Sequence, residues 1–383
     1  MKEIKGILET YEKLDFSRQK AALATVVRIQ GSSYRQPGAR MLILDDGHWN
    51  GAISGGCLEG DALRKAREVM RTGRPRFVSY DTTRDKPTDH IPFSMGCEGI
   101  IDVLIEPLDN DSSTCHPVRI FKEYLSSFQK QLIVTLYDAS HESMGNPGER
   151  LHINHKGQVT DNFSNPEVRE IVINETEKMT SWITSFHGEI VLGNHMATLF
   201  YEILDVPLQL LIFGGGYDVI PVVQMAKNLG WRVTVADECI AKTYPQKFPD
   251  ADKVLNIPGI DVYREAREMK GAYALIMSHN FKYDLEVLRG LLKTDIGYLG
   301  VLGPKKRIKT MLDELKKEGK NSWKDAEKRI HAPVGLNMGA ETPDEIAISI
   351  IAEILAVHNG KPGGFLKDKK GHIHDRETAV QVV

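Results

Sequence analysis

The stretch that decides the fold is Leu208-Gln209-Leu210-Leu211-Ile212-Phe213-Gly214-Gly215-Gly216, an unbroken apolar run followed by three glycines. A strand buried on both faces of a parallel sheet has such a continuous apolar pattern. A helix is expected from the glycines to Asn228, and then a second strand over residues 232–236 that ends at Asp237. This succession is typical of a nucleotide-binding Rossmann unit.

The alternation of strand and helix continues after this unit. Apolar runs at 253–255, 272–277 and 298–302 are separated by helical segments. The spacing predicts a Rossmann-like doubly wound parallel sheet over residues 207–360, followed by a polar tail at 361–383. The predicted fold class is therefore α/β, with an N-terminal α+β module in front of this domain.

The glycine turn is a predicted cofactor site. Gly214 permits the tight turn, Gly216 lets a pyrophosphate approach the backbone, and Asp237 is at the distance that suits a ribose hydroxyl. Val219 stands at the third glycine position and should crowd the helix against the strand. Pro221 falls in the first turns of the helix, where a missing N–H costs least. NAD(P) or another nucleotide is thus a candidate ligand, although a fold alone does not give a function.

Two more loops are expected at the carboxyl ends of sheet strands. Gly303, Lys305 and Arg307 surround a predicted helix start, where unpaired N–H groups and cationic side chains favour an anion. A solvated basic face is an equally good interpretation. His279 follows another strand, either as a general base or, more commonly at such positions, as a hydrogen-bonded residue.

The segment from 331 to 343 is rich in glycine. Thr342 and Glu345 have the spacing of a capping box, which predicts a helix over residues 344–358. Gly335, Gly339 and Glu341 lie before this cap and are candidates to line a ligand.

The N-terminal module, predicted over residues 1–108, contains a cysteine turn. Its expected elements are strands at 22–30, 40–44, 48–53, 76–80 and 100–106 and a helix at 59–71. Residues 109–206 are a middle α+β segment that either extends this module or forms a cap. We identify no chemistry in that segment.

Cys57 follows Gly55 and Gly56 directly, and Glu59 comes two residues later. A thiol between a strand end and a helix start has a lowered pKa, because unpaired N–H groups and the helix dipole favour the thiolate. It can then act as a nucleophile or a soft-metal ligand. The alternative is that the glycines only turn the chain and that Cys57 is a small buried residue.

A second cysteine, Cys97, also lies between glycines, after Gly96 and just before an apolar run. If the two turns converge in space, Cys57 and Cys97 are predicted to be metal ligands. The sequence does not show whether they converge.

Composition narrows the function further. The chain has 383 residues, 41% of them hydrophobic, and a formal net charge of −3, so two or three domains and no nucleic-acid partner are expected. Neither a membrane-spanning run nor a signal peptide is recognised, which predicts a cytoplasmic protein with no membrane partner. The four cysteines form no Cys-x-x-Cys pair, which argues against zinc knuckles and iron–sulfur clusters.

As a set, these motifs resemble the xanthine dehydrogenase accessory protein family, also called the XdhC/CoxI family. At the N-terminal end, the resemblance rests on residues 31–33, 37–40, 54–60 and 96–97. At the C-terminal end it rests on residues 214–216, 300–307 and 331–342.

The resemblance implies a maturation role. Such a protein binds molybdenum cofactor (molybdopterin), supports its sulfuration by a cysteine desulfurase, and delivers it to a xanthine dehydrogenase-type molybdenum hydroxylase. It would be a cofactor-insertion chaperone with no catalytic residue of its own. The sequence leaves open whether the chain forms a homodimer. Thiolates suit molybdenum, and a cation such as Arg40 suits the phosphate of the pterin.

Two other functions stay open. One is an NAD(P)-dependent oxidoreductase or a subunit of a xanthine dehydrogenase system. The other is a scaffold protein whose Rossmann domain binds a partner.

Overall fold

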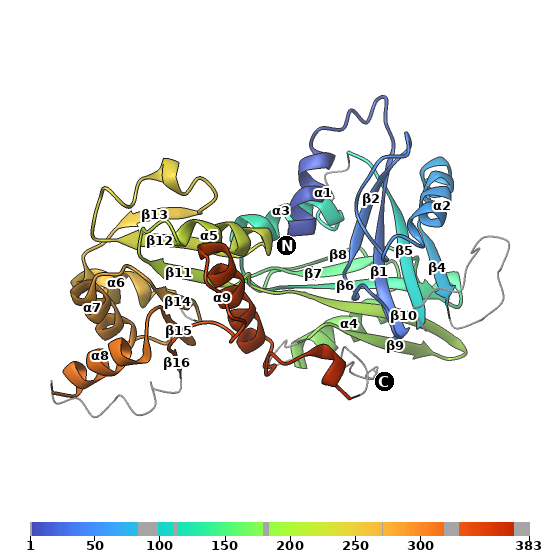
Figure 1. Cartoon of the computed structure of the whole chain (residues 1–383). Helices are drawn as coiled ribbons and strands as arrows, with labels where there is room; N and C mark the ends of the chain where they lie inside the picture. The colour runs from blue at the N-terminus through green and yellow to red at the C-terminus, as the bar shows by residue number, and fades with distance from the viewer. Residues whose placement is uncertain are drawn as a thin grey trace. The chain divides into compact units, whose positions relative to one another are not determined.

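The computed structural model describes residues 2–82, 99–110, 113–178, 184–269, 271–317 and 329–370. The chain divides into two compact units, one up to Val206 and the other over Pro207–Lys370. Figure 1 shows their elements along the chain.

The first unit begins with a five-stranded antiparallel sheet, ordered β3-β2-β1-β5-β4. Helix α2 covers its outer face, where Ala62, Ala66 and Val69 pack on apolar side chains of the strands. The elements are α1 (Lys2–Tyr11), β1 (Ala21–Gly31), β2 (Arg40–Leu44), β3 (Trp49–Gly51), α2 (Glu59–Thr72), β4 (Arg76–Asp81) and β5 (Gly99–Leu108).

A second five-stranded antiparallel sheet, ordered β8-β7-β6-β10-β9, completes this unit. Its elements are α3 (Pro117–Ser127), β6 (Gln131–Ala139), β7 (Arg150–Ile153), β8 (Val159–Asp161), α4 (Pro166–Lys178), β9 (Phe186–Leu192) and β10 (His195–Leu204). Helix α4 packs on one face of this sheet through Val168 and Val172. The opposite face meets the first sheet, because Tyr137 and Phe200 contact Val27 and Leu104.

The second unit is the predicted Rossmann-like domain. Its six strands are parallel and ordered β13-β12-β11-β14-β15-β16. The elements are β11 (Gln209–Phe213), α5 (Val219–Asn228), β12 (Arg232–Asp237), β13 (Lys253–Asn256), α6 (Val262–Ala266), β14 (Tyr273–Ile276), α7 (Phe281–Leu291), β15 (Tyr298–Val301), α8 (Lys305–Lys317), β16 (Ile330–His331) and α9 (Pro343–His358). Short 3₁₀ turns lie at Glu142–Met144, Pro245–Lys247, Gly259–Asp261 and Leu366–Asp368.

Helices cover both faces of this sheet. Side chains of α5 and α9 share one apolar cluster with the strands, and those of α6, α7 and α8 share another. The predicted α/β class is therefore confirmed, with antiparallel sheets in the N-terminal unit and a parallel Rossmann sheet in the C-terminal one. The strand order reverses between β11 and β14, and ligands of such sheets bind at the carboxyl ends of strands at this point.

Candidate functional site

The cysteine turn lies between β3 and α2 and is organised by a single hydroxyl. Ser54 Oγ accepts hydrogen bonds from the N–H groups of Gly56, Cys57 and Leu58, at 3.2, 3.1 and 3.1 Å. The three backbone N–H groups that precede α2 are therefore satisfied within the turn. Cys57 is exposed before the helix start, which excludes the alternative that it is a small buried residue.

Glu59 holds this turn through hydrogen bonds to Ser54 and Leu58. Its carboxylate is 4% exposed and accepts from Ser54 N at 2.8 Å, Ser54 Oγ at 2.6 Å and Leu58 N at 3.2 Å. Burial alone would raise the pKa of this carboxyl, but the hydrogen bonds from Ser54 and Leu58 outweigh it, so the pKa lies below its usual value. Glu59 is thus engaged within the protein and holds the conformation of the turn.

An aromatic ring that sequence reasoning missed lies beside the turn. A β-carbon at Gly55 would stand 3.8 Å from ring atoms of Tyr34, and the Tyr34 side chain is 75% exposed. An accessible aromatic surface therefore lies against Gly55, two residues before the exposed Cys57. Gly96 and Cys97, the other predicted cysteine turn, lie outside the described residues, so convergence of the two sulfurs stays a prediction.

Arg40, predicted to bind a phosphate, is occupied within the fold. It is 4% exposed, ion-paired with Glu202, and donates through Nη1 to the carbonyl of Gly38 at 2.8 Å. Its guanidinium carbon also lies 4.5 Å from the centre of the Phe121 ring. A phosphate at this position would have to displace a buried carboxylate.

The second candidate region lies at the carboxyl ends of β11, β12 and β14. The glycine turn after β11 packs against its neighbours so closely that side chains are excluded. A β-carbon would lie 2.5 Å from the Met277 carbonyl oxygen at Gly214 and 2.6 Å from the Lys242 carbonyl oxygen at Gly215. Gly214 also has a φ of +142°. Close packing thus requires glycine at these positions, as the sequence pattern predicts.

Two carboxylates occupy this turn. Asp237 is 2% exposed; its Oδ2 accepts from the Gly215 N–H and its Oδ1 from the Cys239 N–H, each at 2.9 Å. The Asp218 carboxylate lies over Gly216, where an added β-carbon would clash with its Oδ1. Asp237, expected to meet a ribose, is therefore bonded to the turn that would hold the phosphates.

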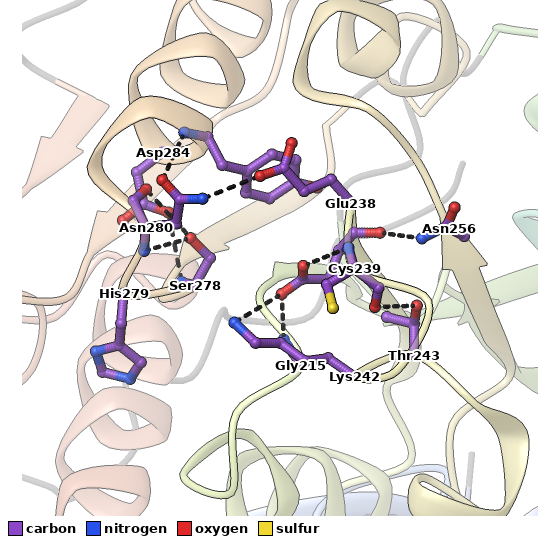
Figure 2. Close-up of polar contacts among 12 residues, drawn as sticks. Gly215, Glu238, Cys239, Lys242, Thr243, Asn256, Ser278, His279, Asn280 and Asp284 are labelled. Atoms are coloured by element: carbon purple, nitrogen blue, oxygen red, sulfur yellow. Dashed lines mark hydrogen bonds and ion pairs between the residues drawn. The ribbon is translucent and has the colours of Figure 1, made fainter.

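Polar contacts also bridge the loops on the two sides of the strand reversal. Asp218 Oδ2 lies 2.8 Å from Nε2 of His279, which takes a left-handed φ of +63°. Asn280 donates to Glu238 Oε1 at 3.0 Å, and Figure 2 shows this bond joining the loop after β14 to the loop after β12. His279 is therefore a hydrogen-bonded residue, which is the commoner of the two roles expected for it. Sequence reasoning missed Asp218 and Asn280 as polar partners in this region.

The helix start after β11 carries the valine and the proline noted in the sequence. Helix α5 begins at Val219, whose side chain is fully buried in the core below the helix. Pro221 falls in the first turn, where its missing N–H leaves no unpaired donor. The larger side chain thus packs in the core between α5 and the sheet, and the expected crowding of the helix stays a prediction.

The remaining predicted residues lie around β15 and α9. Lys305 begins α8 and is exposed, whereas Arg307 donates to the buried Asp284 carboxylate at 2.6 Å. Gly303 has a φ of +127° beside the Arg307 side chain. Arg307 is therefore committed to the fold, and of the three residues only Lys305 presents a free charge within the described part of this loop.

The loop before α9 is held by Glu353. This buried carboxylate accepts from Gly335 N, from Tyr298 OH at 2.9 Å and from His331 Nδ1 at 2.6 Å. Burial opposes its ionisation, but these partners lower its pKa. The capping box of Thr342 and Glu345 is confirmed.

Two further predicted residues of that loop lie at the surface. The predicted site residues Gly339 and Glu341 are exposed and precede the cap.

Within the described ranges, no group of three or more His, Cys, Asp or Glu side chains could hold a metal ion. No helix in those ranges is long and apolar enough to span a membrane.

Comparisons with known proteins agree with the motifs. Residues 210–354 match the XdhC Rossmann domain, and residues 17–81, which include Cys57, match the XdhC and CoxI family. A solved structure from Bacillus halodurans, described as a xanthine dehydrogenase, is 30% identical over 94% of this chain and 96% of its own, with a TM-score of 0.73.

Two curated relatives are similar over most of their length. A probable xanthine dehydrogenase subunit from Bacillus subtilis (strain 168) is 26% identical over 88% of this chain and 93% of its own. The molybdenum cofactor insertion chaperone PaoD of Escherichia coli (strain K12) is 23% identical over 89% of this chain and 84% of its own.

Proposed function

The chain belongs to the XdhC and CoxI family, and from that premise we propose that it is an accessory protein of a molybdenum hydroxylase. It receives molybdenum cofactor, holds it while a cysteine desulfurase sulfurates it, and delivers it to a xanthine dehydrogenase-type enzyme in the cytoplasm. A relative named as a molybdenum cofactor insertion chaperone supports this role.

The observation that carries the proposal is the exposed thiol of Cys57 on a fixed turn. Ser54 and Glu59 use their own hydrogen-bonding groups to shape the turn, so the thiol is the group that it presents to solvent. Molybdenum and its dithiolene sulfurs are soft, and a cysteine sulfur is a soft ligand for them. The cofactor is the cargo in this account.

Tyr34 complements the thiol chemically. A pterin is a flat heteroaromatic ring, and an exposed aromatic side chain offers a surface on which such a ring can stack. We assign the metal end of the cargo to Cys57 and its ring to Tyr34, with Cys97 as a second sulfur ligand.

The test is cofactor content. The full chain and its Cys57→Ser variant are expressed with molybdate and purified, and molybdenum and oxidised pterin are quantified. Cofactor on the wild type and its loss from the variant are expected. A wild type that contains no pterin under these conditions contradicts the carrier role.

A nucleotide-dependent oxidoreductase is the weaker candidate. The Gly215 N–H that a pyrophosphate would need is donated to Asp237, and the Asp218 carboxylate covers Gly216. A phosphate at this turn would therefore have to displace a carboxylate that already has protein partners, since Asp237 lies 4.0 Å from Lys242 Nζ and Asp218 pairs with His279. The residues present therefore do not fit a dinucleotide in this conformation.

Membership of a permanent enzyme complex has one specific observation in its favour, namely the xanthine dehydrogenase names of two relatives. Size-exclusion chromatography with a mature hydroxylase separates this role from that of a carrier. A carrier binds the cofactor-free enzyme and leaves the loaded one, whereas a permanent component remains in a stoichiometric complex with both.

A further inference from the structure

The two sheets of the first unit have the same topology. Each is built from three successive strands, a helix and two more strands, and each is preceded by a helix. The orders β3-β2-β1-β5-β4 and β8-β7-β6-β10-β9 are equivalent position by position. We call residues 2–108 the first repeat and residues 117–204 the second repeat.

The sequence retains traces of the same relationship. Pro37-Gly38-Ala39-Arg40 enters β2, and Pro147-Gly148-Glu149-Arg150 enters the equivalent β7. The register also agrees, because Thr25 pairs with Arg40 between β1 and β2, and Thr135 pairs with Arg150 between β6 and β7. Equivalent strands thus carry equivalent residues at equivalent heights.

The repeats are joined by two reciprocal ion pairs. Arg40 of the first repeat pairs with Glu202 of the second, and Arg150 of the second pairs with Glu106 of the first. All four side chains are buried. In each Pro-Gly-x-Arg segment, the glycine lies against the carboxylate that pairs with the arginine of that segment. A β-carbon at Gly38 would be 2.9 Å from Glu202 Oε1. The corresponding distance from Gly148 to Glu106 Oε1 is 3.1 Å.

The repeats differ where the helix starts. In the second repeat, Asn165 Oδ1 simply accepts from the N–H groups of Glu167 and Val168 at 2.7 and 3.0 Å. In the first repeat, the equivalent place has the two glycines and the exposed Cys57. The fold therefore does not need the cysteine turn, because the second copy forms the same architecture with an ordinary cap.

Three contacts, together with the loop from Tyr34 to Gly38, connect the second repeat to this turn. Glu202 pairs with Arg40, and Arg40 Nη1 donates to the carbonyl of Gly38. Gly38 ends the loop that carries Tyr34, and the Tyr34 ring lies against Gly55. The loop that contacts the cysteine turn at Gly55 is thus anchored by a carboxylate from the opposite repeat.

We propose that the first unit arose by internal duplication and that only the first repeat carries a functional cysteine turn. Glu202 of the second repeat is then a positioning residue for Cys57 and Tyr34. The second repeat then serves to fix the loop that contacts the cysteine turn. The cargo readout rests on the proposed function, whereas the reactivity of the thiol does not.

The duplication supplies its own control. Glu202→Gln and Glu106→Gln each weaken one of two equivalent buried ion pairs, but only Glu202 connects to the Tyr34 loop. Alkylation of Cys57 by iodoacetamide in the full chain is followed by mass spectrometry of its peptide. We expect E202Q to change the rate by about threefold or more, since thiol reactivity follows the local environment, and E106Q to leave it near the wild-type value.

Equal effects of the two variants on Cys57, or no effect of either, overturn the proposal. If E202Q does not fold, the paired replacement of Arg40 and Glu202 by Met gives the test, because apolar pairs commonly substitute for buried ion pairs without loss of folding. The paired variant should fold and show the altered alkylation rate, and a wild-type rate contradicts the inference.

Cofactor content separates this inference from the proposed function. Pterin lost from E202Q and kept by E106Q supports both. A wild type without pterin sinks the carrier role, while the alkylation rates still decide the positioning role of Glu202.

Discussion

The buried carboxylate of Asp237 accepts a hydrogen bond of 2.9 Å from the N–H of Gly215, the group that a Rossmann fold offers to a pyrophosphate. The turn is closed further by the Lys247 ammonium, which donates to the Gly215 carbonyl. The domain thus has the architecture of a nucleotide-binding fold, but at Gly215 the hydrogen-bonding groups of its phosphate-binding turn are paired with side chains of the domain itself.

This contact predicts that the full chain does not bind NADH. We expect a dissociation constant weaker than about 1 mM, which corresponds to less than about 4 kcal/mol of binding free energy. A fluorescence titration of NADH measures it. The Asp218→Asn variant removes one charge from the turn and should bind no more weakly than the wild type. Micromolar binding by the wild type contradicts this interpretation of the turn.

The glycine turn should tolerate no side chain. Gly214→Ala places a methyl group against the Met277 carbonyl at a positive φ, and we expect a loss of about 1–3 kcal/mol in the free energy of unfolding of the second unit. Gly297→Ala is the matched control, since no atom lies within 4 Å of its added β-carbon, and about 0.5 kcal/mol or less is expected. Thermal unfolding compares the two, and equal losses would show that packing at Gly214 is not the cause.

Glu59 should stabilise the cysteine turn in a pH-dependent way. Its pKa is lowered in the folded protein, so its contribution is present above the unfolded value of about 4.3 and is lost as the pH falls through the folded value. Glu59→Gln should cost about 1–3 kcal/mol near neutral pH, because an amide cannot accept all three hydrogen bonds.

The difference in stability between wild type and E59Q should therefore shrink as the pH is lowered below about 4.3. Chemical unfolding at a series of pH values measures it, with Glu170→Gln as a control, since Glu170 is an exposed glutamate of α4 in the same unit. A difference that does not vary with pH would mean that Glu59 is not charged in the turn.

Much of the fold follows from local patterns. The unbroken apolar run at β11, the glycines after it and the capping box of α9 are each specified within a few neighbouring residues, and the structure has them at the predicted positions. Helix α4 and strand β10 were missed, because α4 has only a weak apolar stripe and β10 carries polar residues on a buried face.

The candidate site was less accessible to sequence reasoning. Arg40 looked like a phosphate ligand because its partner, Glu202, is remote in the chain. The partners of Asp237 and His279 likewise come from other loops. The repeated Pro-Gly-x-Arg segment was a visible signal of the duplication, but strand pairing was needed to interpret it.

Cofactor transfer tests the carrier role most directly. The purified chain, loaded with molybdenum cofactor, is mixed with a cofactor-free xanthine dehydrogenase, and the recovery of hydroxylase activity is measured. Cys239→Ser is the matched control, because Cys239 is another exposed thiol and lies in the other unit. We predict recovery with the wild type and with C239S and little recovery with Cys57→Ser. Equal recovery with all three proteins would contradict the assignment of Cys57 as the group that holds the cofactor.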